Sequence, residues 1–130
     1  MNYLLAALMG SVFILSISFA DGGEHTPDFC SATDKKVCAH IGHMSGMKTK
    51  GEAEFMVDIL LPKEVSNLKV DLWMPEHNHG TEPVTVSPYK TNKFKIKKAL
   101  FTMPGIWHAR LSFDQGKTAH KIEIPLTIKE

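Results

Sequence analysis

The sequence has little that marks an enzyme or a nucleic-acid-binding protein. Its formal net charge is only +1 and it has no long basic block, so we expect no nucleic-acid partner. It lacks a Gly-x-Ser-x-Gly elbow, a glycine-rich phosphate loop and a His-Glu-x-x-His helix. No stretch shows the apolar period of an amphipathic helix. We therefore expect a protein that is not an enzyme and is built from strands.

Charge is missing altogether from residues 1–20, where an apolar run ends in small residues before an abruptly polar segment. This pattern predicts a cleavable signal peptide over residues 1–20, although the first residues lack the usual Lys or Arg. The alternative is an uncleaved membrane anchor. The run is close to the lower length limit for a span, and no basic stop signal follows it. We expect a periplasmic or secreted protein with no stable membrane span after cleavage.

Cysteine is scarce, since the chain has only Cys30 and Cys38. Export would place them in an oxidising space, so we predict that they form a disulfide. The competing interpretation makes both cysteines thiolate ligands, together with His40 and His43. Residues 21–50 are otherwise polar and lack periodicity, and we expect a loosely ordered segment that is pinned by the disulfide if the disulfide forms. They also hold a second cluster of candidate metal ligands, formed by His40, His43, Met44 and Met47.

What the sequence does contain is alternation of apolar and polar residues from residue 51 onward. This period-two pattern predicts strands over 54–61, 68–74, 83–88, 93–103, 106–113 and 120–128. The inward parity slips between Ile96 and Ala99, and a β-bulge near Lys97 and Lys98 would restore it. Trp107 has inward parity and is expected at the centre of the core. Among the other rings, the pattern places Trp73 and His108 outward and His120 inward.

Short, evenly spaced strands without helices predict an all-β protein. We expect residues 51–130 to form an antiparallel immunoglobulin-like β-sandwich of six strands, or seven with a short strand before Gly51. A small closed barrel is the second choice. The two cysteines precede the first clear strand, so they cannot form the inter-sheet bridge of antibody domains.

Two Met-Pro steps end predicted strands and bring soft ligands into short turns. The first is Met74-Pro75, followed by His77, His79 and Gly80; proline interrupts strand pairing, and Gly80 could supply a positive φ. Residues two apart in an extended segment point the same way, so both imidazoles could face one ion.

The second step, Met103-Pro104-Gly105, offers a further thioether in a similar setting, and Gly105 allows a reversal. Imidazole and thioether ligands together favour copper, as Cu(I), so we predict a metal site formed by His77, His79, Met74 and Met103. In the alternative interpretation the two methionines fill the core and the His-Asn-His turn is simply solvated.

Three segments resemble motifs of the YtkA-like and FixH-like exported bacterial domains. They are Met74-Pro75-x-His77-x-His79-Gly80, Phe94-x-Ile96, and Phe101-Thr102-Met103-Pro104-Gly105-Ile106-Trp107-x-Ala109-x-Leu111. The resemblance covers about residues 52–128. It implies an immunoglobulin-like sandwich of the cell envelope that is associated with copper handling and respiratory-oxidase assembly, and it does not imply an enzyme. FixH-type proteins keep a membrane anchor, whereas this chain is predicted to be cleaved.

Two functions therefore remain open from the sequence. The first is an exported copper-binding protein that acts as a metal carrier or assembly accessory, whose partners are a copper ion and an envelope protein such as a respiratory oxidase. The second is an envelope protein-interaction module that binds no metal, docks through a sheet edge or Trp73, and carries the His/Met turn incidentally.

Overall fold

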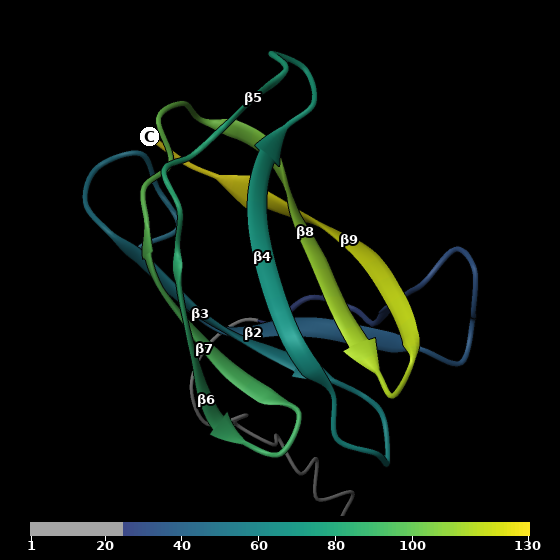
Figure 1. The fold of residues 1–130 in the computed structure, drawn as a ribbon. Coiled ribbons are helices and arrows are strands. Elements are labelled where there is room, and N and C mark those ends of the chain that lie inside the picture. Colours follow the sequence, from purple (N-terminus) through teal and green to yellow (C-terminus); the bar gives the residue numbers. More distant parts are fainter. Residues whose placement is uncertain (1–24) are drawn as a thin grey trace, which may run out of the picture.

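The structure, a computed structural model, describes residues 25–130, which form two antiparallel β-sheets without a helix. The predicted signal peptide over residues 1–20 lies outside the described residues. One sheet has the strand order β1-β2-β3-β7-β6 and the other β5-β4-β8-β9, so the predicted all-β sandwich is confirmed and the closed barrel is not found (Figure 1). In this part of the chain no helix is long and apolar enough to cross a membrane.

The chain crosses from one sheet to the other three times, after β3, after β5 and after β7. The bounds of the strands are β1 Phe29–Cys30, β2 Cys38–Ser45, β3 Ala53–Ile59, β4 Ser66–Met74, β5 His79–Gly80, β6 Thr85–Lys90, β7 Lys93–Ala99, β8 Gly105–Gln115 and β9 Thr118–Ile128.

Nine strands occur in the described residues, where the sequence predicted six or seven. The two that exceed seven are β1 and β5, which have two residues each. Strand β2 pairs with β3 and lies where the optional strand before Gly51 was expected. The expectation that residues 21–50 are loosely ordered was therefore wrong for β2. The register of β2 shifts between Gly42 and Ser45, and His43 has a φ of 48°. This irregularity breaks the alternation by which a strand is recognised in a sequence.

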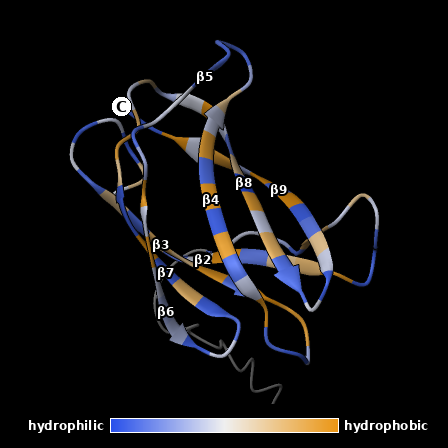
Figure 2. Ribbon diagram, viewed as in Figure 1, coloured by the Kyte–Doolittle hydropathy of each residue, from blue (hydrophilic) through white to orange (hydrophobic). Residues whose placement is uncertain are grey.

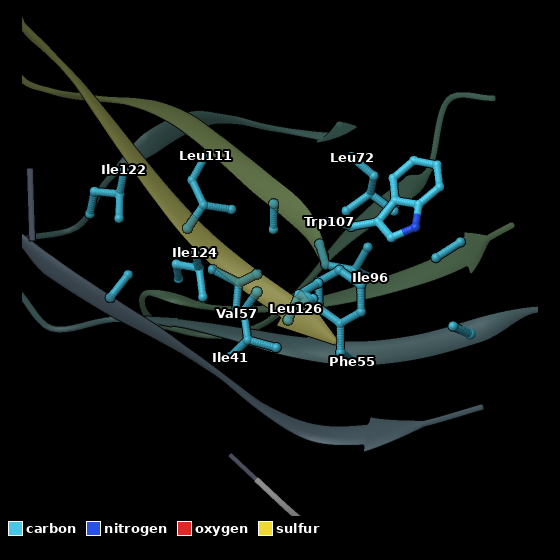
Figure 3. Close-up of a cluster of buried hydrophobic side chains, with 14 of the residues drawn as sticks. Ile41, Phe55, Val57, Leu72, Ile96, Trp107, Leu111, Ile122, Ile124 and Leu126 are labelled. Carbon is cyan, nitrogen blue, oxygen red and sulfur yellow. The ribbon is translucent and has the colours of Figure 1, made fainter. Parts of the chain in front are cut away.

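The alternating strands present one apolar face to the interior, as expected for a half-buried sheet. In β4, β8 and β9, hydrophobic and hydrophilic residues alternate along the ribbon (Figure 2). Trp107 is 0% exposed, which confirms its predicted burial. Among the side chains labelled in Figure 3, it lies toward one end of the group.

The predicted bulge in β7 is present. Ala53 of β3 pairs with Ala99 and Phe55 pairs with Ile96, so β7 has one residue more than β3 between these two pairs. Lys98 takes up the irregularity with a φ of 59°. The bulge returns Ala99 to the buried face, where it is 0% exposed.

One buried side chain connects the β6–β7 turn to the segment between β3 and β4. Asn92 is 5% exposed and has a φ of 59°, a conformation that asparagine tolerates. Its Oδ1 accepts a hydrogen bond from the backbone N of Val65 at 2.9 Å. Its Nδ2 donates to the carbonyls of Leu61 and Lys63 at 2.9 and 2.8 Å. The crossover between the two sheets is thereby fixed to the β6–β7 hairpin.

The two cysteines are joined by a disulfide between β1 and β2. Cys30 and Cys38 lie directly opposite each other in the ladder, with their Cα atoms 3.9 Å apart. Neither is a free thiol, so the interpretation of both as thiolate ligands is wrong for this structure. The bridge closes a loop at the edge of the five-stranded sheet.

Candidate functional site

The first Met-Pro step forms a four-residue turn between β4 and β5. Strand β4 ends at Met74 because Pro75 has no N–H for the ladder. The chain reverses through Asn78, whose φ is 54°, and β5 begins at His79, opposite Met74. The expected positive φ at Gly80 is not found. A Cβ at Gly80 would instead stand 3.1 Å from the carbonyl oxygen of Leu72, so glycine here permits close strand packing.

The second Met-Pro step lies at the same end of the sandwich. Gly105 reverses the chain with a φ of 129°, as predicted, and a Cβ there would stand 3.0 Å from the methyl group of Met74. The indole N–H of Trp107 donates to the carbonyl oxygen of Met103 at 2.9 Å. These contacts place both turns at one rim of the molecule, beside β5 (Figure 1).

At this rim an imidazole and a thioether lie in direct contact. Nε2 of His79 is 3.3 Å from Sδ of Met103. Metal bonds of about 2.0 Å to nitrogen and 2.3 Å to sulfur place two such atoms roughly 3–4 Å apart on one ion. The ring of His79 also meets Trp107 at a centroid distance of 5.4 Å, in a T-shaped arrangement. Because Trp107 is buried, its ring shields one side of the His79–Met103 pair from solvent.

The other two predicted metal ligands, His77 and Met74, are not in contact with this pair in an arrangement ready to bind an ion. His77 is exposed, and the centroid of its ring is 6.1 Å from that of His79, close enough for a solvated side chain to turn toward a shared ion. Met74 is only 1% exposed, and its methyl group packs over Gly105 in the core. The structure thus brings His79 and Met103 together, leaves His77 adjacent to them and buries Met74.

The second cluster predicted from the sequence is divided between two faces of the sheet. Met44 and Met47 pack against the hydrophobic core. His43 is exposed, whereas His40 lies near Asp28 and Asp58 on the outer face, where its Nδ1 is 3.0 Å from Oδ1 of Asp28. These four residues therefore do not form one site. Within residues 25–130 no three His, Cys, Asp or Glu side chains already converge as metal ligands.

The rings of His108, Trp73 and His120 contact residues outside both candidate sites. Nδ1 of His108 lies 3.0 Å from Oε2 of Glu123 on the outer face of the four-stranded sheet. Trp73 faces outward as predicted, and the guanidinium of Arg110 lies 4.6 Å from the centre of its ring. His120 is buried as predicted, and its Nδ1 has no hydrogen-bond partner among residues 25–130.

Sequence reasoning did not find every residue that borders these sites. It treated Trp107 only as a core residue, although its ring also bounds the His79–Met103 pair. It also passed over Asp28 and Asp58 beside His40. The outward parity of Asp58 in its strand was the one available signal. Comparison of the chain with protein-family models, curated proteins and solved structures gave no match.

Proposed function

We propose that this chain is an exported copper-binding protein that holds Cu(I) at the rim formed by the two Met-Pro turns. It would act as a metal carrier or as an accessory in respiratory-oxidase assembly, with the ion as its cargo and an envelope protein as its partner. The resemblance to YtkA-like and FixH-like domains suggested this role. The observation that carries it is the contact between Nε2 of His79 and Sδ of Met103 at 3.3 Å.

The donor set at the rim is soft. His79 and Met103 would be the first two ligands, and exposed His77 would be the third after rotation of its side chain. A thioether contributes little to binding a hard ion but binds Cu(I) well, so this set favours Cu(I) over Zn²⁺ or Mg²⁺. Met74 is buried, and in this proposal it supports the turn from the core instead of acting as a ligand.

The alternative function is an interaction module that binds no metal. The burial of Met74 favours it, because one predicted ligand then has a packing role. The outward-facing Trp73 beneath Arg110 would be part of its docking surface.

A Cu(I) competition titration with a chromogenic chelator separates the two functions. Met103→Leu keeps the volume and apolar character of the side chain and removes only the sulfur. We expect this variant, and likewise His79→Ala, to bind Cu(I) roughly tenfold or more weakly, which corresponds to about 1.4 kcal/mol or more.

The matched control is His108→Ala, which removes an imidazole paired with Glu123 outside the rim. Its Cu(I) affinity should equal that of the unmodified protein, and circular dichroism should show that all variants are folded. If Met103→Leu and His79→Ala bind Cu(I) as tightly as the control, the rim is not a copper site and the interaction module becomes the better proposal.

A further inference from the structure

A groove of about 680 Å³ runs over the outer face of the five-stranded sheet. Histidines and carboxylates gather on its β2 side. The N-terminal segment is fixed there, because the N–H of Thr26 donates to the carbonyl of Ile41 at 2.7 Å and the N–H of Ile41 donates to Oγ1 of Thr26 at 2.9 Å. This segment brings His25 and Asp28 beside His40 of β2.

His40 has a carboxylate near each of its ring nitrogens. Nδ1 lies 3.0 Å from Oδ1 of Asp28, and Nε2 lies 3.5 Å from Oδ2 of Asp58. Asp58 is also 3.7 Å from Nζ of Lys93, which keeps this carboxylate engaged behind the ring. A metal-bound histidine commonly has such a partner, because a carboxylate that accepts the second N–H fixes the tautomer and orientation of the ring.

His25 is oriented in a similar way. Its Nδ1 lies 3.1 Å from the carbonyl oxygen of Thr26, which can only accept a hydrogen bond. Nδ1 therefore carries the proton, and Nε2 keeps its lone pair for a ligand bond. The centroids of the His25 and His40 rings are 5.9 Å apart. Two imidazoles, each with one nitrogen in contact with a polar group of the protein, thus lie beside each other in the lining of the groove.

We propose that this groove binds Cu(II) through Nε2 of His25, Nδ1 of His40 and the carboxylate of Asp28, with water completing the coordination. The 3.0 Å separation between Nδ1 of His40 and Oδ1 of Asp28 is that of neighbouring ligands bound at about 2 Å to one ion. In the bound state the neutral ring of His40 carries its one proton on Nε2, which lies 3.5 Å from Oδ2 of Asp58, and Nδ1 exchanges its contact with Asp28 for the metal. A doubly protonated ring releases the Nδ1 proton to solvent, and a neutral ring protonated at Nδ1 transfers that proton to Nε2 through solvent. A nitrogen and carboxylate set suits Cu(II), the divalent ion of the first row that such ligands bind most tightly.

The site is assembled by the ion. No three ligands already converge in residues 25–130, so the exposed ring of His25 must rotate toward His40 when the ion binds. The site uses no residue of the rim, and the inference therefore does not depend on the proposed Cu(I) function. It assigns the two oxidation states of copper to different faces of the molecule.

Titration of the full chain with aqueous Cu(II), followed by electron paramagnetic resonance, tests the proposal. We expect one site with two nitrogen ligands, and at least about a tenfold loss of affinity in His25→Ala and in His40→Ala. Asp58→Asn leaves all three ligands in place and should still weaken binding roughly tenfold, the usual effect of losing an outer carboxylate. Substitution of a residue that only maintained the fold would not change the nitrogen hyperfine pattern of the bound Cu(II).

Two controls keep the outcomes distinct. His43→Asn removes another histidine of the groove and keeps a residue that tolerates a positive φ, so Cu(II) binding should be unchanged. Met103→Leu tests the rim and should also leave Cu(II) binding unchanged. If Cu(II) affinity and spectrum are the same in folded His25→Ala and His40→Ala, or if binding is lost only in a His77→Ala/His79→Ala double variant, the groove is not a copper site.

Discussion

A single buried imidazole at the β8–β9 end of the molecule offers a test at the scale of one residue. His120 is 5% exposed and packs against the ring of Phe113 at a centroid distance of 5.7 Å, yet its Nδ1 finds no hydrogen-bond partner in the part of the chain that the structure describes. A buried polar atom without a partner costs about 1–3 kcal/mol. His120→Leu should therefore leave the free energy of unfolding unchanged or raise it by roughly 1 kcal/mol, as measured by urea denaturation.

The neighbouring buried position provides the comparison. Ile122→Ala removes an apolar side chain from the same face of β9 and should lower stability by about 2–5 kcal/mol. A loss of similar size in His120→Leu would mean that the imidazole has a stabilising partner, and would contradict the prediction.

At the scale of the element, the side chain of Asn92 ties the β6–β7 turn to the segment between β3 and β4. Replacing it with alanine removes three hydrogen bonds, leaves the carbonyls of Leu61 and Lys63 without this donor and places a Cβ-bearing residue without local polar contacts at a φ of 59°. With about 0.5–1.5 kcal/mol for each bond, Asn92→Ala should cost roughly 3 kcal/mol.

The matched variant is Asn92→Gly, which accepts the backbone conformation and loses the same three bonds. It should remain destabilised, somewhat less than the alanine variant, because only the backbone strain is relieved. Thermal unfolding of both variants would separate the contribution of the three hydrogen bonds from that of the backbone strain. Full stability of the glycine variant would show that the three bonds contribute nothing.

How far each element could be predicted depended on how regular it is. The bulge at Lys97 and Lys98 was predictable because buried positions continue in regular order on both sides of it. Strand β2 could be anticipated only as an optional short strand before Gly51, because Gly42 has no side chain to mark a face and the register shifts directly after it. Strand β5 has only two residues, which is too short for any period.

At the scale of the whole molecule, the core and the rim share Trp107. Trp107→Ala removes the largest of the fully buried side chains and should cost about 3–5 kcal/mol, enough to unfold much of a marginally stable domain. Trp107→Phe keeps one six-membered ring, leaves a smaller cavity than alanine and loses the N–H donated to the carbonyl of Met103, so a loss of about 1–3 kcal/mol, smaller than that of alanine, is expected. Urea denaturation of the two variants would give both values, and normal melting of the alanine variant would rule out this role in the core.

The rim itself could be predicted only in part. The recurrence of a Met-Pro step indicated two comparable turns, and parity placed Met74 and Trp107 inward. The contact between His79 and Met103 spans 24 residues and depends on the register in which β4 pairs with β8, where Leu72 lies opposite Ala109. No local pattern specifies that register, so the sequence could nominate the ligands but could not tell which of them meet.

The order of strands along the chain has a consequence for when the domain can fold. Strand β9 is the last strand of the sandwich, and it supplies a complete row of buried side chains, formed by His120, Ile122, Ile124, Leu126 and Ile128. Until residue 128 has left the ribosome, β8 lacks its longest partner and the interior lacks this whole row of side chains. A nascent chain should therefore stay extended until synthesis has passed this strand, and then collapse in one cooperative step.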